Sequence, residues 1–233
     1  MNTRIEITNL QKKYGRKVVI QDMDLTLESG KVYGLLGPNG QGKTTLIKCI
    51  AGLLTPEKGQ ILINGEMRET RHKGMISMLA DKDLFYKWMT VQDAINFYDT
   101  FFEDFDRADS EELIRFMELV PQEKVEKLSK GMKARLKLVL VLSRKAKIYL
   151  LDEPLSGIDP VSREKIVETI LGRIREDAVM VISSHMVHAI ESLLDEVILL
   201  SNGKIIAKEE AEIIRSEKGI SIDDYYLEVF RHA

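Results

Sequence analysis

The sequence has little of several features that mark secreted or membrane-spanning proteins. It contains one cysteine, Cys49, which leaves no internal disulfide, and it opens with Met-Asn-Thr-Arg in place of a basic and apolar leader. Its longest apolar runs, such as Val139–Leu142 and Ile148–Leu151, are far shorter than the roughly 20 residues that span a bilayer. We therefore expect a cytosolic chain, for which another protein would supply any membrane span.

The charge of the chain is nearly balanced. There are 34 lysines and arginines against 37 aspartates and glutamates, for a net charge of -3. Nothing in this balance indicates a basic surface that would bind nucleic acid or anionic lipid, so no nucleic-acid partner is expected. With 44% hydrophobic residues over 233 positions, and no Pro-rich linker or repeat, the sequence predicts one large domain.

Two early segments carry the two-residue alternation of half-buried strands. Ile5–Ile7 belongs to an antiparallel pair that turns around Tyr14-Gly15, and a second pair is predicted at Gln60–Asn64. We expect these strands to form an antiparallel β lobe over about residues 1–30 and 57–70.

A helical period of 3.6 residues dominates from Thr90 to about Leu142. Thr90 and Asp93 form the pattern of a capping box that opens one helix, and Ser110, followed by two glutamates, is expected to open another. The sequence predicts a helical lobe over about residues 83–145, inserted into the rest of the domain.

Strands and helices then alternate. Apolar runs predict strands at Ile148–Leu151, Val179–Ser183 and Glu196–Leu200, and helices are predicted at Ser162–Arg175 and near His188–Leu194. This alternation is typical of a parallel sheet covered by helices on both faces. The predicted fold class is α/β, with a parallel core that carries the two lobes.

A glycine-rich loop lies between an apolar run at Val32–Leu36 and a predicted helix at Lys43–Leu53. It matches the pattern GxxxxGK[ST] through Gly37, Pro38, Asn39, Gly40, Gln41, Gly42, Lys43 and Thr44. In such a loop, backbone N–H groups and the helix N-terminus bind phosphate oxygens, the lysine reaches the β- and γ-phosphates, and the hydroxyl ligates Mg²⁺. The alternative is an ordinary glycine-rich turn, but its position between strand and helix favours a phosphate loop.

Acidic and imidazole side chains follow two of the later strands. A phosphate loop needs a carboxylate at the end of another core strand, where Asp152 lies. Glu153 is the candidate for polarising the attacking water, since Pro154 stops the strand from continuing. His185 follows the predicted strand Val179–Ser183, at the sheet edge where ligands of open α/β sheets bind, and is a candidate contact of the γ-phosphate. The alternatives are that the two acids only face solvent at the end of the strand and that His185 has a structural role.

These and other motifs resemble the nucleotide-binding domains of the ABC ATPase superfamily, whose core is a RecA-like P-loop NTPase fold. The resemblance covers nearly the whole chain. In family order, the matching residues are Tyr14, Gly37–Thr45, Met78–Asp81, Leu128–Met132, Leu150–Pro154, Ser156–Pro160 and Ser184-His185.

The resemblance implies ATP and Mg²⁺ as cofactors and gives individual residues a role. It assigns catalysis to Lys43, Glu153 and His185. It assigns metal binding to Thr44, Asp152 and Asp81, and further nucleotide contacts to Tyr14, Thr45 and Asp159.

The segment Leu128–Met132 resembles the signature motif of the family. The resemblance implies that Ser129 and the amides around Gly131 bind the ATP of a partner subunit, identical or paralogous, in a head-to-tail dimer around two ATP molecules. An ordinary Ser N-cap before a helix at Met132–Ser143 is compatible with this, because capping and phosphate binding use the same N–H groups.

The chain departs from the family pattern at three positions. Lys130 and Met132 replace the usual Gly and Gln of the signature, from which we expect a working but weaker phosphate contact. Asp81 stands where Gln is commonest, and its carboxylate still offers a hard oxygen to Mg²⁺ or to its water.

Two segments favour a transporter subunit. Leu84–Met89 is rich in aromatic residues where the ATPases of family transporters receive a helix of the membrane subunit, and the equally open alternative is that Phe85 and Trp88 pack within the helical lobe. Ser221–Phe230 resembles the closing helix of ATPases of small ABC-2-type exporters. We expect a separate transmembrane permease that holds the chain at the inner face of the cell membrane. The alternatives are a soluble ABC ATPase acting on a ribosome or DNA assembly, and another P-loop enzyme such as a small-molecule kinase.

Overall fold

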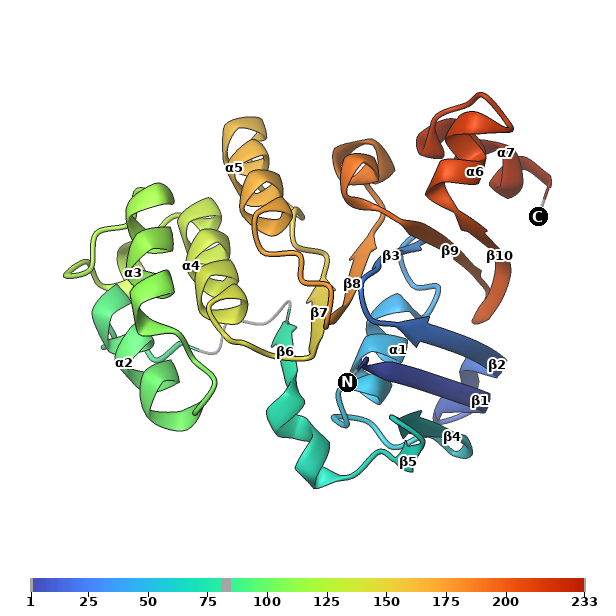
Figure 1. Cartoon of the computed structure of the whole chain (residues 1–233), viewed down its shortest axis with the longest axis horizontal. Helices are drawn as coiled ribbons and strands as arrows, with labels where there is room; N and C mark the ends of the chain where they lie inside the picture. Colours follow the sequence, from blue (N-terminus) through green and yellow to red (C-terminus); the bar gives the residue numbers. More distant parts are fainter. Residues whose placement is uncertain (1, 81–84, 233) are drawn as a thin grey trace.

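The computed structural model describes residues 2–80 and 85–232, in which two β-sheets are flanked by helices (Figure 1). The first sheet is antiparallel, has the order β2-β1-β4-β5, and consists of β1 (Arg4–Tyr14), β2 (Lys17–Glu28), β4 (Lys58–Ile63) and β5 (Glu66–Met67). Tyr14 pairs with Lys17 across the first turn. The predicted antiparallel strands and their turn at Tyr14-Gly15 are therefore confirmed.

The second sheet has the order β10-β9-β3-β8-β7-β6. Its strands are β3 (Val32–Leu36), β6 (Ile76–Leu79), β7 (Ile148–Asp152), β8 (Val179–Ser184), β9 (Glu196–Ser201) and β10 (Lys204–Glu210). All neighbours from β9 to β6 pair in parallel, which confirms the α/β prediction, and β10 adds an antiparallel edge.

Seven α-helices and four short 3₁₀ helices complete the described part of the chain. The α-helices are α1 (Lys43–Ile50), α2 (Val91–Phe101), α3 (Arg107–Phe116), α4 (Lys130–Leu142), α5 (Pro160–Leu171), α6 (Ala211–Ser216) and α7 (Ile222–His232). The 3₁₀ helices are η1 (Thr70–Met75), η2 (Val125–Lys127), η3 (Val187–Ala189) and η4 (Glu191–Leu193).

Two helix starts test the capping arguments. Thr90 and Asp93 form the predicted capping box at the start of α2. The predicted start at Ser110 is wrong, because α3 begins after Asp106, whose side chain accepts a hydrogen bond from the Asp109 N–H. Ser110 lies inside this helix, where its hydroxyl donates to a backbone carbonyl one turn earlier.

The α-helix predicted near His188–Leu194 is also wrong. The segment forms η3 and η4 instead, and Val187, Ile190 and Leu193 are all buried. Their three-residue spacing places these side chains on one face of a 3₁₀ helix, which has three residues per turn.

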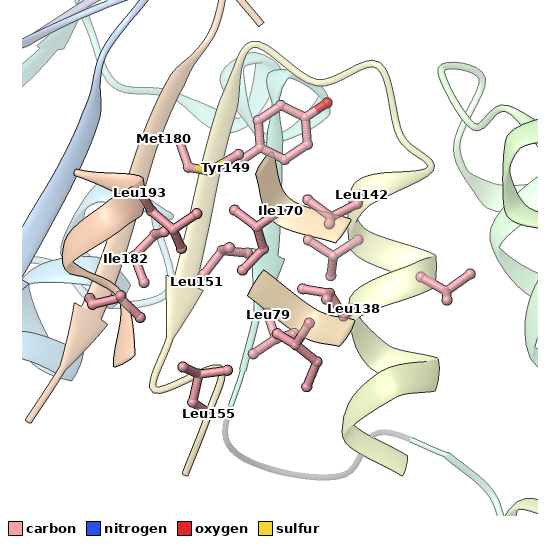
Figure 2. Packing of buried hydrophobic residues seen from close by; sticks show 14 of the residues in the cluster. Leu79, Leu138, Leu142, Tyr149, Leu151, Leu155, Ile170, Met180, Ile182 and Leu193 are labelled. Atoms are coloured by element: carbon pink, nitrogen blue, oxygen red, sulfur yellow. The ribbon is translucent and has the colours of Figure 1, made fainter. Parts of the chain in front are cut away.

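Two hydrophobic cores lie on opposite faces of the parallel sheet, because alternate residues of each strand point to opposite sides. On β7, Ile148 and Leu150 face the core that contains α1 and the antiparallel sheet, while Tyr149 and Leu151 face the core beneath α4 and α5. Figure 2 shows Tyr149 and Leu151 packed with side chains from the neighbouring strand and from these helices.

The core around α1 contains the one cysteine. Cys49 is fully buried, and burial raises the pKa of its thiol to about 11. A thiol that stays protonated and inaccessible is a packing residue, so Cys49 is excluded as a nucleophile.

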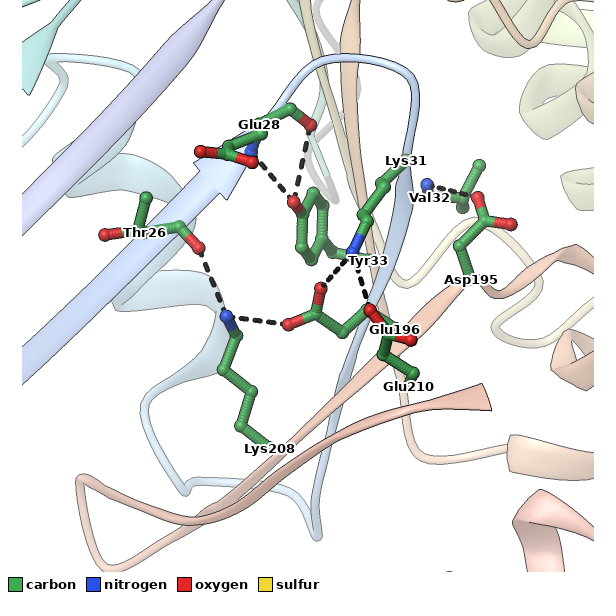
Figure 3. Close-up of polar contacts among 9 residues, drawn as sticks. All are labelled: Thr26, Glu28, Lys31, Val32, Tyr33, Asp195, Glu196, Lys208 and Glu210. Carbon is green, nitrogen blue, oxygen red and sulfur yellow. Dashed lines mark hydrogen bonds and ion pairs between the residues drawn. The ribbon is translucent and has the colours of Figure 1, made fainter. Parts of the chain in front are cut away.

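An ion-pair network joins the edge of the parallel sheet to the antiparallel one (Figure 3). The Glu196 carboxylate, nearly buried on β9, pairs with Lys31 at 3.2 Å and with Lys208 of β10 at 2.7 Å. Hydrogen bonds to Glu210 and Glu196 raise the pKa of Lys31. Since Lys208 also donates to the carbonyl of Thr26 on β2, at 3.4 Å, the network fixes β10 against β2.

Candidate functional site

The phosphate loop leaves β3 after Leu36 and enters α1 at Lys43. Gly42 precedes the helix with φ of 103°, and a Cβ atom there would lie 2.8 Å from the Val19 carbonyl oxygen. A Cβ atom on Gly37 would lie 2.4 Å from the carbonyl oxygen of Leu200. Because the loop passes so close to two other backbones, these positions require glycine.

The turn between β9 and β10 packs against this loop, which sequence analysis missed. The Gln41 side-chain oxygen accepts a hydrogen bond from the Asn202 N–H at 2.5 Å, and the same turn is tied to β2, where the Gln21 N–H donates to the Gly203 carbonyl at 3.0 Å. The sequence signal was the dipeptide Asn202-Gly203, which is typical of a two-residue hairpin turn.

Lys43 is buried between the phosphate loop and Glu153. Its ammonium donates to the carbonyls of Gly37 at 2.6 Å and Pro38 at 3.1 Å, and lies 3.3 Å from Glu153 Oε1. The ammonium therefore already lies inside the curve of the loop, where bound phosphate oxygens would replace the carbonyls.

Asp152 accepts two hydrogen bonds on one carboxylate oxygen. The Thr44 hydroxyl donates to its Oδ1 at 3.0 Å, and the Ser183 hydroxyl donates to the same atom at 2.7 Å. Ser183 also accepts from the Glu153 N–H at 2.9 Å. Sequence analysis did not identify Ser183 as a site residue. A serine at the end of an apolar strand, next to the candidate His185, was the sequence feature that could have indicated it.

Glu153 is held from both sides. Its Oε2 lies 2.8 Å from His185 Nδ1, while its Oε1 faces Lys43. The backbone at Glu153 is left-handed, with φ of 50°, a conformation that costs energy in a residue other than glycine and is concentrated at functional sites. The turn aims the carboxylate back across the sheet edge toward the phosphate loop.

The donor set suits a magnesium ion that is also bound to a nucleotide. In residues 2–80 and 85–232, no group of three His, Cys, Asp or Glu side chains could hold a metal. Thr44 and Asp152 offer two hard oxygens 3.0 Å apart, and Mg²⁺ takes its remaining ligands from phosphates and water. Asp81, the third predicted ligand, lies outside the described residues.

The signature residues gather at the start of α4. The Ser129 hydroxyl accepts from the Met132 N–H at 3.2 Å, so the N-cap interpretation is confirmed. A Cβ atom on Gly131 would lie 3.4 Å from Asp159 Oδ2, which places the signature beside the N-terminus of α5. Asp159 caps that helix by accepting from the Ser162 N–H at 2.9 Å, and this hydrogen bond lowers its pKa.

The remaining predicted site residues differ in their exposure to solvent. Thr45 is buried in the first turn of α1, while Asn39 and Gly40 are exposed at the tip of the loop. Tyr14 is 50% exposed at the end of β1, where the Lys12 ammonium lies 5.9 Å from the centre of its ring.

Two cavities flank the end of β6. The first, which we call the apolar cavity, has about 170 Å³ and is lined mainly by Met78, Phe85, Tyr86, Phe97, Tyr98 and Phe102. The second, the carboxylate cavity, has about 320 Å³ and contains Asp152, Glu153, Lys130 and Ser156.

The aromatic segment after β6 is only partly exposed. Phe85 packs against the larger core, whereas Tyr86 and Trp88 are exposed and stack with ring centres 5.9 Å apart. The predicted aromatic patch therefore contains Tyr86 and Trp88 but not Phe85, and Leu84 lies outside the described residues.

Comparisons with known proteins agree on one family. The family profile described as "ABC transporter" matches residues 20–156. The chain is 30% identical over 208 residues to the "Lantibiotic transport ATP-binding protein SrtF" of Streptococcus pyogenes, covering 88% of this chain and 90% of that protein. It is also 30% identical over 234 residues to the "Nod factor export ATP-binding protein I" of Rhizobium johnstonii, covering 95% of this chain and 74% of that protein.

A solved structure agrees with this assignment. The "Structure of ATP binding subunit of ABC transporter" superposes with a TM-score of 0.84 at 26% identity, over 97% of this chain and 99% of that one. The chain belongs to the ABC transporter family and is an ATP-binding subunit that hydrolyses ATP. None of the helices in the described ranges has the length and apolar character needed to cross a membrane.

Replacing Ser183 by alanine tests the link between the two acids. Ser183→Ala removes the hydroxyl that bonds Asp152 and the Glu153 N–H, so we expect ATP turnover to fall about 10–100-fold, the usual effect of losing a group that orients a metal ligand. Steady-state phosphate release measures this. Ser184→Ala is the matched control, since that neighbouring buried hydroxyl bonds only the Met186 N–H among the contacts described. Equal turnover in the two variants would contradict the assigned role of Ser183.

Proposed function

We propose that the chain is the ATPase subunit of an ABC exporter, which closes as a head-to-tail dimer around two ATP molecules and drives a separate transmembrane subunit. A single nucleotide-binding domain spans all 233 residues. The observation that carries the proposal is the position of Glu153, with Lys43 on one carboxylate oxygen and His185 on the other, beside the Thr44–Asp152 pair.

ATP binding is proposed to use the phosphate loop and the start of α1. The backbone N–H groups of Gly37–Thr45 and the positive end of the helix dipole bind the phosphates, and Lys43 exchanges its carbonyl partners for the β- and γ-phosphate oxygens. Tyr14 stacks on the adenine, for which its half-exposed ring is available.

Thr44 and Asp152 would hold Mg²⁺, with Asp81 as a further proposed ligand. When bound, the ion neutralises charge that develops on the phosphates during transfer. Ser183 keeps the Asp152 carboxylate turned toward Thr44, which fixes the ligand geometry before nucleotide arrives.

Hydrolysis is proposed to follow from positioning. Glu153 orients a water molecule and accepts its proton as the water oxygen bonds to the γ-phosphorus and the bond to the bridging oxygen of ADP breaks. His185 holds the Glu153 carboxylate through Oε2 and contacts the γ-phosphate. The buried Lys43 ammonium stabilises charge on the transferred group in a site largely shielded from water.

The dimer completes each site with the signature residues of the other subunit. Ser129 is exposed at the N-cap of α4, and the first amides of a helix have no backbone acceptor within it, which supports phosphate binding from outside the chain. Asp159 lies against the same turn and would face the dimer interface. The partner ATPase is either an identical copy or a paralogue.

The membrane subunit is proposed to dock at the apolar cavity. Its aromatic lining, together with the exposed Tyr86 and Trp88, suits the apolar face of a short helix. The relatives named for lantibiotic transport and Nod factor export support a transporter, and the second supports an exporter. Docking would hold the chain at the inner face of the cell membrane.

The glutamine variant of Glu153 tests hydrolysis separately from binding. Glu153→Gln keeps the shape but cannot accept the proton, so we expect ATP-dependent dimers that persist while turnover falls about 10²–10⁴-fold, the range attributed to a general base. Lys43→Ala is the contrasting control and should lose ATP binding. Size-exclusion chromatography with light scattering and a phosphate-release assay measure both. Turnover of Glu153→Gln at the level of the unmodified chain would remove Glu153 from this role.

The permease is tested by gentle extraction of the chain from its native membranes, followed by mass spectrometry of the proteins that stay bound. We expect a polytopic membrane protein to be recovered, and we expect Tyr86→Ala with Trp88→Ala to reduce its recovery. If ribosomal or DNA-associated proteins are recovered without a membrane protein, the exporter proposal fails while the ATP chemistry stands.

A further inference from the structure

The apolar cavity and the carboxylate cavity share part of their walls. Leu79, Ala80 and Lys137 line both cavities, so each of these residues faces the aromatic lining on one side and the space beside Asp152 and Glu153 on the other. A change in the volume or contents of one cavity therefore acts on residues that also bound the other.

The end of β6 connects this wall to the acids through the sheet. Leu79 pairs in parallel with Leu151, so Ala80 and Asp152 leave the sheet side by side at the same edge. Since β7 is buried along its length and close-packed interiors transmit strain, a displacement of Ala80 would act on the strand end that carries Asp152 and Glu153.

Lys137 links this strand end to α4. The side chain is half-buried, and its ammonium lies 3.4 Å from the Ala80 carbonyl oxygen, within donor range. The side chain lines both cavities, and a lysine combines an apolar stem with a charged end, so one residue can contact both apolar and polar surroundings.

We propose that Lys137 is a positioning residue that couples the contents of the apolar cavity to the geometry of Asp152 and Glu153. The inference rests on the proposed function, in which a segment of the permease occupies the apolar cavity. Binding is reciprocal: if an occupied apolar cavity changes the affinity for ATP, then bound ATP changes the affinity of the apolar cavity for its occupant by the same factor. The proposal therefore requires the apolar cavity to respond to bound ATP, and this response can be followed on the chain alone.

Trp88, the one tryptophan of the sequence, reports on the apolar cavity because it stacks on Tyr86, which lines it. The chain is titrated with Mg²⁺ and a non-hydrolysable ATP analogue, and its tryptophan emission is followed after correction for absorbance. Binding of the analogue is measured separately by calorimetry. We expect the emission of the unmodified chain to change with the same midpoint as binding.

Lys137→Met keeps the aliphatic part and removes the charge. We expect its affinity for the analogue to stay within about threefold, as for most substitutions that touch no ligand, while most of the emission change is lost. Lys137→Arg, which keeps the cation, should restore the change. Lys133→Met is the matched control on α4: Lys133 lines a groove with Phe85 and Tyr86 but not the carboxylate cavity, and should leave the change intact.

Steady-state kinetics provide a second readout. If Lys137 positions the acids, Lys137→Met should lower kcat with little change in KM. General destabilisation would instead lower the fraction of active protein and leave the emission response per bound nucleotide unchanged. A full emission change in Lys137→Met, or none in the unmodified chain with bound analogue, would overturn the coupling role. Failure of the analogue to bind the unmodified chain would instead overturn the proposed function.

Discussion

The parallel register of β3, β8 and β7 is the constraint on which the site depends. Asp152 lies opposite Ser183, and Leu36 lies opposite Ser184, so the phosphate loop, both acids and His185 leave the sheet at one edge. A slip of one residue would turn each strand's side chains to the other face and separate these groups. The two hydrophobic cores, which require alternate residues of every central strand to face opposite sides, oppose such a slip.

The site carries a conformational cost that its neighbours offset. Glu153 has a left-handed backbone, and its carboxylate is mostly removed from solvent. The buried Lys43 ammonium, the His185 ring and the Ser183 hydroxyl supply the contacts that hold this turn in place. Since the same groups are proposed to handle phosphate and water, the interactions that stabilise the turn also orient the reacting groups.

The sequence was sufficient where chemistry requires neighbouring residues of fixed type. The phosphate loop and the pair Asp152-Glu153 are short contiguous patterns, and the alternation of the first strands directly predicts their pairing. Contacts across the sheet leave no such pattern, so Ser183 and Asn202 were missed as site residues. In the segment after β8, the buried residues are Val187, Ile190, Leu193 and Leu194, a spacing that suits an α-helix as well as 3₁₀ helices, so the pattern alone could not distinguish the two.

The most direct test of this account is a crystal structure of the chain with Mg²⁺ and a non-hydrolysable ATP analogue. We expect the Lys43 ammonium to leave the carbonyls of Gly37 and Pro38 and to bind the phosphates, while Ser183 stays on Asp152 and Glu153 faces the γ-phosphate. A bound analogue with Lys43 still on those carbonyls, or with its γ-phosphate turned away from Glu153, would contradict the central claim that this sheet edge is the hydrolytic site.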